Sequence, residues 1–337
     1  MDFQLSDDQR ALRSGMRDLL GAVFDRDRLR AAVDRGGALD RSLWRELGAA
    51  GFFALRLPEE AGGVGLGLPE AVLLFEEAGR ALLPGPLVAT HLAAGLVKGA
   101  AEGEAVVTAV DGDLPVAHLE GADAVLTGAD ALTGEALRDV VAAARPVRSM
   151  DPLTPLHRVA GRAAATEAHP GALRQETALR DEAALLTAAE QLGSAARSTE
   201  AAVQHAGERE QFGSPVGSFQ AVKHLCADML ARTEPARAAV YAAAVTGDPV
   251  EIAAAKLLAD DAAVRNARDC LQIHGGMGFT WEADVHLHLK RAWLRAASWL
   301  TGAGAEELLA ADLGVAGPRP GSSGAYGRGV PEAGGGG

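Results

Sequence analysis

The 337-residue sequence is poor in cysteine and in aromatic residues. Its two cysteines, Cys226 and Cys270, lie in apolar helical patterns. Two such residues provide no disulfide framework, so we expect reduced core thiols. Aromatic residues make up only 4% of the chain, which argues against a large β-sandwich because aromatic side chains are enriched in strands. The hydrophobic fraction of 48%, much of it alanine, suits helix–helix packing instead.

Basic residues and long apolar runs are also scarce. The 32 Lys and Arg are outnumbered by 45 Asp and Glu, and the formal net charge is −13. This balance disfavours nucleic-acid binding, which needs clustered basic residues. The longest apolar run, 87–97, contains His91 and is too short to span a bilayer. Residues 1–8 are acidic and show no signal-peptide pattern, so we expect a soluble cytoplasmic protein with no membrane span.

Several common site motifs are missing. The sequence has neither a P-loop nor a Gly-x-Ser-x-Gly elbow. The glycines of 63–67 lack the spacing of a dinucleotide site, and we expect a turn that packs closely. His286 and His288 stand two apart, would point to different faces of a helix, and have no third ligand nearby. We therefore expect no metal site.

The pattern of apolar residues predicts three regions and a tail. Over 1–100, Ser6 with Gln9 forms a capping-box pattern before an amphipathic helix, Asp40 can cap a second helix, and a third begins near Pro69. Over 101–178, short β-branched or apolar runs broken by Gly, Asp and Pro predict a small β-rich domain, with a connection over 161–178. These runs include residues 106–107, 116, 125–126, 140–141 and 159.

Residues 179–314 return to long helices. We expect one from about Asp181 to Gly207, one after Gly217 that Pro235 kinks or ends, and others over 249–271 and 283–311. Four such helices indicate an antiparallel bundle. The tail over 315–337, rich in Gly, Ser and Pro, is expected to be disordered.

Two stretches of the helical half are the most informative. Residues 207–224 read Gly-Glu-Arg-Glu-Gln-Phe-Gly-Ser-Pro-Val-Gly-Ser-Phe-Gln-Ala-Val-Lys-His, and 272–282 read Gln-Ile-His-Gly-Gly-Met-Gly-Phe-Thr-Trp-Glu. Together with residues 1–6, 57–67 and 76–80, they resemble the acyl-CoA dehydrogenase family. The resemblance covers about 1–100 and 181–295. It implies a mainly α fold with an N-terminal helical domain, a reduced middle β domain and a C-terminal four-helix bundle.

The resemblance also implies that these motifs bind the adenosine and diphosphate end of FAD, mostly in a neighbouring subunit's site. An arginine offers a planar fork to phosphate, and glycines let backbone amides approach an anion. In isolation the same arginine and glutamine would be surface residues, and the paired glycines a helix C-cap. The residues assigned to FAD are Arg209, Gln211, Phe212, Gln220, Gln272, His274, Gly275 and Gly276.

Members of this family oxidise an acyl-CoA thioester to its enoyl form, and a carboxylate removes the α-proton. Ungapped counting places Trp299 and Ala183 at the two usual positions of that base. Glu182, beside Ala183, is the candidate we name, although one residue on a helix is a turn of about 100°. Its alternative is an acid in the first turn of a helix, complementing the helix dipole.

The middle region lacks the Thr-Glu-Pro-x-x-Gly-Ser-Asp-like loop and the Trp-Ile-Thr-like strand that cradle the flavin in this family. Short subunits of heteromeric acyl-CoA dehydrogenases share this pattern. We therefore expect a subunit that acts with a larger homologous subunit on an acyl-CoA substrate and passes electrons to an electron-transfer protein. A self-sufficient homo-oligomer that uses Glu182 and a non-catalytic scaffold are the alternatives.

Overall fold

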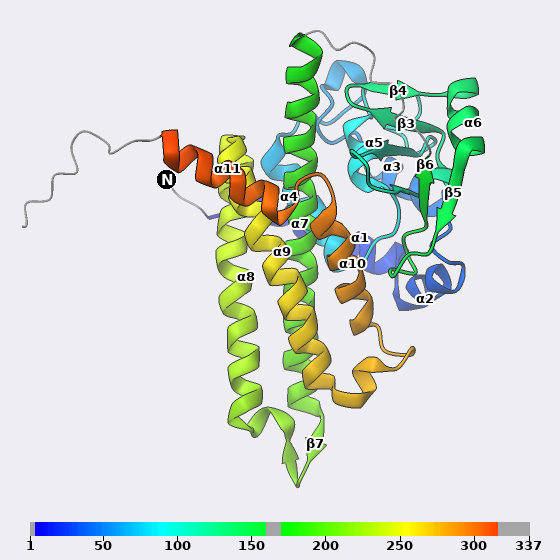
Figure 1. Ribbon diagram of the computed structural model, residues 1–337. Coiled ribbons are helices and arrows are strands. Elements are labelled where there is room, and N and C mark those ends of the chain that lie inside the picture. The colour runs from blue at the N-terminus through cyan, green and yellow to red at the C-terminus, as the bar shows by residue number, and fades with distance from the viewer. Residues whose placement is uncertain (1–3, 160–169, 316–337) are drawn as a thin grey trace, which may run out of the picture.

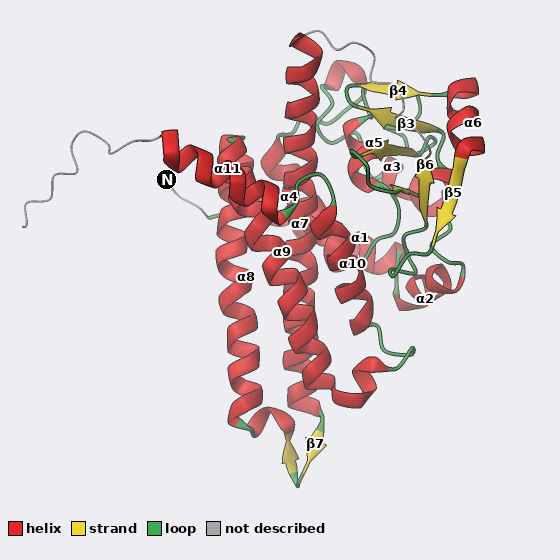
Figure 2. Cartoon of the chain, viewed as in Figure 1, coloured by secondary structure: helices red, strands yellow, loops and turns green. Residues whose placement is uncertain are grey.

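The computed structural model describes residues 4–159 and 170–315, which form a helical N-terminal part, a small β part and a long helical bundle (Figures 1 and 2). This is the fold class that the sequence predicts. The N-terminal helices are α1 (Asp7–Val23), α2 (Arg26–Asp34), α3 (Arg41–Ala49), α4 (Leu68–Arg80) and α5 (Leu87–Leu92).

The starts of the N-terminal helices follow from local hydrogen bonds. The Ser6 hydroxyl accepts from the Gln9 backbone N–H and the Gln9 side chain accepts from that of Ser6, which confirms the capping box. The Asp40 carboxylate caps α3 as predicted. In the loop before α4, a Cβ at Gly63 would lie 2.1 Å from the Leu57 carbonyl oxygen, so this turn packs closely, also as predicted.

The β part consists of two three-stranded sheets, ordered β1-β3-β4 and β2-β6-β5. Only the β1–β3 pair among these is parallel, with Val107 opposite Ala124. The bounds are β1 (Val107–Val110), β2 (Val116–Ala117), β3 (Ala124–Thr127), β4 (Asp130–Leu132), α6 (Gly134–Ala143), β5 (Ala144–Val147) and β6 (Leu156–Val159).

The apolar run at 140–141 was wrongly assigned to a strand. Val140 and Val141 lie in α6, and with Leu137 they form an i, i+3, i+4 face that packs on Val125 of β3. A pair of adjacent valines does not reveal its periodicity until a residue three positions away is considered.

The bundle contains α7 (Pro170–Glu208), α8 (Gln220–Thr246) and α9 (Pro249–His274), followed by α10 (Val285–Ala297) and α11 (Gly302–Val315). A short hairpin, β7 (Glu210–Gln211) and β8 (Ser214–Pro215), joins α7 to α8. Figure 1 shows α7, α8 and α9 running side by side, with the β7–β8 hairpin at one end.

Two details of the predicted bundle were wrong, and a third prediction is narrowed. The predicted connection over 161–178 is helical from Pro170 onward, so Glu182 lies in the interior of α7 and not in its first turn. Helix α8 does not end at Pro235, as one of the two expected outcomes had it: the helix continues through this exposed residue, where water can satisfy the carbonyl left without its N–H partner. The other expected outcome, a kink at Pro235, stays a prediction. The predicted fourth helix is two helices, because the chain breaks at Trp299, whose φ is +62°. The disordered tail predicted over 315–337 lies, from residue 316 onward, outside the residues that the structure describes.

Helices α4 and α7 approach each other at two glycines. A Cβ at Gly193 would lie 1.8 Å from the Glu76 carbonyl oxygen, and one at Gly79 would lie 2.0 Å from that of Glu190. No side chain fits between the two backbones there, so this crossing fixes the position of Glu190 along α7.

Both cysteines are free thiols, as predicted. Cys270 is buried between the ends of α7, α8 and α9, and burial raises the pKa of its thiol to about 12. Cys226 is partly buried in the same cluster. A thiol with so high a pKa is not a nucleophile at neutral pH.

Candidate functional site

The residues assigned to FAD gather at one end of the bundle, although two segments more than 50 positions apart supply them (Figure 1). We call this end the bundle tip. One segment leaves α7 through the hairpin and enters α8; the other leaves α9 through the short 3-10 helix η4 (Gly275–Phe279). The first supplies Arg209, Gln211, Phe212 and Gln220; the second supplies Gln272, His274, Gly275 and Gly276.

A histidine pair joins the two segments of the tip. The rings of His205, near the end of α7, and His274, at the end of α9, are stacked with centroids 4.1 Å apart. The Nδ1–H of His274 donates to the Cys270 carbonyl at 2.8 Å, which fixes the orientation of its ring. The stack therefore positions the first motif against the second.

The side chains at the tip are presented to the outside. Phe212 is 94% exposed and its backbone has φ +54°, a conformation that costs free energy for a residue with a side chain. The Gln211 side chain donates to the neighbouring Glu210 carbonyl, and Gln220 contacts His224 at 2.9 Å. Gly275 has φ +61° and caps α9, so the C-cap interpretation holds for this glycine.

Glu182 lies on a different face of α7 from Thr187 and Glu190, which line the cavity described next. Its carboxylate pairs with the Arg56 guanidinium, and burial raises the pKa of the carboxyl group. The buried Ala183 instead begins a stripe at i, i+4 and i+7 with Thr187 and Glu190. The role of Glu182 as a base stays a prediction.

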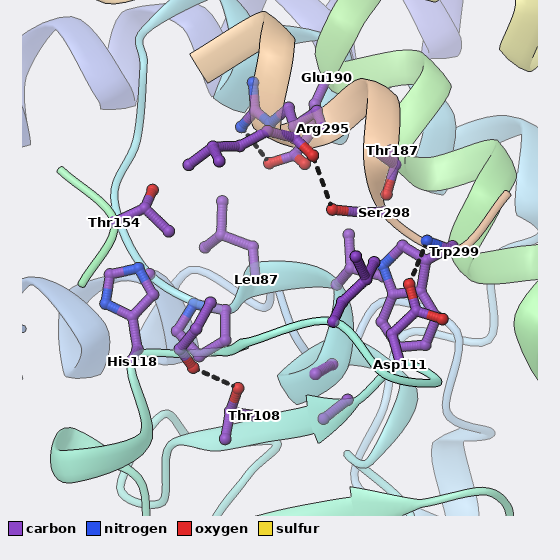
Figure 3. A pocket seen from close by; sticks show the side chains of 18 of the residues that line it. Leu87, Thr108, Asp111, His118, Thr154, Thr187, Glu190, Arg295, Ser298 and Trp299 are labelled. Atoms are coloured by element: carbon purple, nitrogen blue, oxygen red, sulfur yellow. Dashed lines mark hydrogen bonds and ion pairs between the residues drawn. The ribbon is translucent and has the colours of Figure 1, made fainter. Parts of the chain in front are cut away.

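A cavity of about 150 Å³ lies between α5, the β1–β2 region, α7 and α10 (Figure 3). Trp299, the residue counted at the usual base position, lines it with its indole. The Trp299 backbone N–H donates to Asp111, and its carbonyl accepts from Arg180 at 2.9 Å. Arg180 also pairs with Asp111 at 2.9 Å, so these two side chains together hold the break after α10 in place.

The same cavity contains charged side chains that the sequence interpretation did not single out. Arg295 donates to the Glu190 carboxylate at 2.6 Å, and Arg291 pairs with Asp151. Burial lowers the pKa of Arg295 to about 10 and raises that of Glu190. The available signal was the stripe of Leu287, Arg291 and Arg295 along α10, in which arginines occupy positions of a buried helix face.

His286 and His288, which both lie on α10, contact different residues. His288 is hydrogen-bonded through Nδ1 to the Ser194 hydroxyl at 2.8 Å, and burial lowers its pKa to about 3. The His286 ring is stacked on Trp281 with centroids 5.3 Å apart.

Within residues 4–159 and 170–315, no helix combines the length and apolar character needed to cross a membrane.

Comparison with known proteins identifies the family. The acyl-CoA dehydrogenase N-terminal domain matches residues 6–102, and the acyl-CoA dehydrogenase C-terminal domain matches residues 171–316. The chain is 37% identical to acyl-CoA dehydrogenase IpdE2 of Mycobacterium tuberculosis, over 85% of this chain and 91% of that protein. The chain belongs to the acyl-CoA dehydrogenase family, and with it to a family of oxidoreductases.

Two further similarities concern size and assembly. The chain is 39% identical to acyl-CoA dehydrogenase FadE34 of M. tuberculosis over 83% of its own length, but spans only 45% of that protein. Its fold is similar to a chain in the crystal structure of the ChsE4–ChsE5 complex from M. tuberculosis. That match has a TM-score of 0.78 at 23% identity and covers 93% of this chain and 99% of the other.

Proposed function

We propose that this chain is a subunit of an FAD-dependent acyl-CoA dehydrogenase that acts in a mixed assembly with a larger homologous chain. The observation that carries this proposal is the bundle tip. There, the stack of His205 on His274 joins two distant motifs, and Phe212 is presented outward. Residues arranged in this way suit a cofactor held at a boundary between subunits.

The chemistry of the tip residues fits the phosphate and adenosine part of FAD. Arg209 supplies a charged planar fork, Gln211 and Gln220 supply amide donors, and Phe212 supplies a flat apolar face. At Gly276 an added Cβ would have no atom within 4 Å, so the backbone is open to a ligand. When bound, FAD would supply the hydride acceptor for oxidation of the acyl thioester.

The interior of the chain supports the need for a partner. The two counted base positions hold Ala183 and Trp299, neither of which can accept a proton from carbon. The cavity beside Trp299 measures about 150 Å³, whereas pockets for drug-sized ligands are typically ~300 Å³ or larger. We therefore propose that the larger chain contributes the base and the space for the acyl group. The similarity to a chain of the ChsE4–ChsE5 complex supports a mixed assembly.

The test is to co-express this chain with its longer homologue and to measure FAD per assembly by native mass spectrometry and flavin absorbance. Arg209→Ala should weaken FAD binding about tenfold or more, because a charge-assisted contact to phosphate is lost. The matched control is Arg265→Ala, an exposed arginine of α9 that pairs only with Asp261 among the described residues. It should leave FAD content unchanged.

Two results would contradict the proposal. Unchanged FAD content in the Arg209→Ala assembly would remove the assignment of the tip to FAD. A homo-oligomer of this chain that is purified alone, holds FAD and oxidises acyl-CoA would remove the need for a partner. In that case, the dehydrogenase activity of the Glu182→Gln variant would test whether Glu182 is the base.

A further inference from the structure

Alanine fills much of the contact between the long helices of the bundle. The buried residues of α7 and α9 include Ala188, Ala195, Ala202, Ala255, Ala259 and Ala263. Alanine side chains are small and alike, whereas a single well-ordered arrangement requires side chains of complementary shape. Apolar contacts alone therefore leave the position of each helix along its neighbour weakly defined.

A layer of polar side chains crosses this apolar interface. Asn266 of α9 is fully buried, and its side-chain amide reaches both neighbouring helices. The Nδ2 group donates to the hydroxyl of Thr199 on α7 at 3.1 Å and to that of Thr233 on α8 at 2.9 Å. It also lies 2.9 Å from the Met229 carbonyl oxygen on α8. We call Thr199, Thr233 and Asn266 the polar layer.

The hydrogen bonds of the polar layer are consistent with one another. Thr199 and Thr233 each donate to the carbonyl four residues earlier in their own helices, at 2.9 Å. Both hydroxyls therefore keep lone pairs that can accept from Asn266. The Asn266 Oδ1 accepts from the Arg232 Nε at 2.8 Å, and because a guanidinium only donates, this contact fixes which end of the amide faces the threonines.

The polar layer opposes movement of one helix along another. A slip of one helical turn displaces a helix by about 5.4 Å, whereas N–H···O hydrogen bonds reach only about 3.2 Å. After such a slip the buried amide of Asn266 would lose its threonine partners, and an unmade hydrogen bond on a buried donor costs free energy. A single buried asparagine fixes the register of coiled coils in the same way.

The polar layer lies near the bundle tip along two of the helices. Thr199 precedes His205 on α7, and Asn266 precedes His274 on α9, by roughly 9 Å and 12 Å of helix. Both helices are continuous over these lengths. The level at which Asn266 meets Thr199 therefore sets the level at which the rings of His205 and His274 stack.

We propose that Asn266 is a positioning residue for the bundle tip. Through the polar layer it sets the register of α7, α8 and α9, and it thereby holds the two motif segments together. The effect on FAD rests on the proposed function, whereas the effect on the histidine stack does not.

Asn266→Leu in the full chain tests the proposal. Leucine is similar in size and leaves no buried donor behind, because the threonine hydroxyls keep their own carbonyl partners and the Arg232 side chain is 22% exposed. We therefore expect a urea midpoint close to that of the wild type. Nuclear Overhauser contacts between the His205 and His274 rings, measured with isotope-labelled histidine, should disappear. The FAD affinity of the co-expressed assembly should fall at least tenfold.

Ser198→Ala is the matched control. Ser198 is buried on α7 beside Thr199, but its hydroxyl has no hydrogen-bond partner within residues 4–159 and 170–315. This change removes a buried polar group without touching the polar layer. The ring contacts and the FAD affinity should both stay as they are in the wild type.

The outcomes separate register from stability and from the proposed function. If Asn266→Leu lowers the urea midpoint but keeps the ring contacts, the layer serves stability alone and the proposal is overturned. Loss of the ring contacts with wild-type FAD affinity would also overturn it. If the wild-type assembly holds no FAD, the proposed function fails, and the ring contacts decide whether Asn266 sets the register. Should Asn266→Leu not fold, Asn266→Ala removes the amide without added bulk and is measured in the same way.

Discussion

Among the buried histidines of the described part of the chain, His91, His118 and His288 have strongly lowered pKa values. Burial is the largest cause of the fall in pKa for each, to about 4, 3 and 3. In the unfolded chain their pKa values return to about 6.5. The folded state therefore excludes protons that the unfolded state accepts.

This difference makes stability dependent on pH in a defined window. Below about pH 6.5 the unfolded chain gains protons that the folded chain refuses, so the free energy of unfolding falls as the pH falls toward about 3. Each such histidine contributes up to about 1.4 kcal/mol per pH unit. Urea unfolding between pH 6.5 and 4.5 should show a shallower decline for His288→Gln than for the wild type.

The exposed His224 on α8 provides the comparison, because His224→Gln should leave the decline as it is in the wild type. Equal declines in the His288→Gln variant and the wild type would show that His288 is protonated in the folded state.

Single residues also show what sequence could and could not predict at the candidate site. The sequence motifs were enough to name Arg209, Gln220 and Gly275 as candidate residues, because a motif is recognised from the order of its residues along the chain and does not require the fold. The motifs did not reveal that Trp299 and Asp111 face the same cavity, since this depends on a contact between α10 and the β part. Arg291 and Arg295 were not singled out, although they share a helix face with Leu287, because arginine is usually a surface residue.

At the level of elements, the crossing of α4 and α7 is the tightest contact described above. Gly193→Ala raises helix propensity, but its new methyl group would lie within 2 Å of the Glu76 carbonyl oxygen. We expect a net loss of unfolding free energy of about 1–3 kcal/mol, as for overpacking in a core. Chemical denaturation measures it.

Gly15→Ala in α1 is the matched comparison. Gly15 is exposed and a Cβ there meets no atom within 4 Å, so the same change should stabilise the chain by about 0.5–1 kcal/mol. If Gly193→Ala stabilised the chain as Gly15→Ala does, the close backbone approach would be refuted.

Helix starts were easier to predict than helix ends. Ser6 and Asp40 predict the starts of α1 and α3, because a capping side chain accepts hydrogen bonds from backbone N–H groups only two or three residues away. The break between α10 and α11 has no such local cause. Trp299 adopts a positive φ and is held by Asp111 and Arg180, and the first of these is nearly 190 positions earlier in the chain.

At the level of the whole molecule, the tip exposes large apolar side chains. Phe212, Phe279 and Met277 are 94%, 74% and 61% exposed in the single chain. Clustered apolar exposure of this kind marks interaction surfaces. In the proposed mixed assembly, this end would be covered by the larger chain.

Phe279→Ser should therefore lower the fraction of this chain found in the mixed assembly, as measured by native mass spectrometry after co-expression. Leu313→Ser serves as the comparison, since Leu313 is 77% exposed on α11 and lies outside the tip. Loss of assembly in both variants, or in neither, would argue against the tip as the contact surface.

Helix α7 passes through both candidate sites without interruption, with Glu190 in the cavity wall and Glu208 beside the tip. At 1.5 Å per residue, the 18 positions between them correspond to roughly 27 Å along one axis. Ligands at the two sites are too far apart to touch. A ligand at one site could change the affinity of the other site only through a movement of helix α7. If α7 does not move, the binding constants of the two sites should be independent.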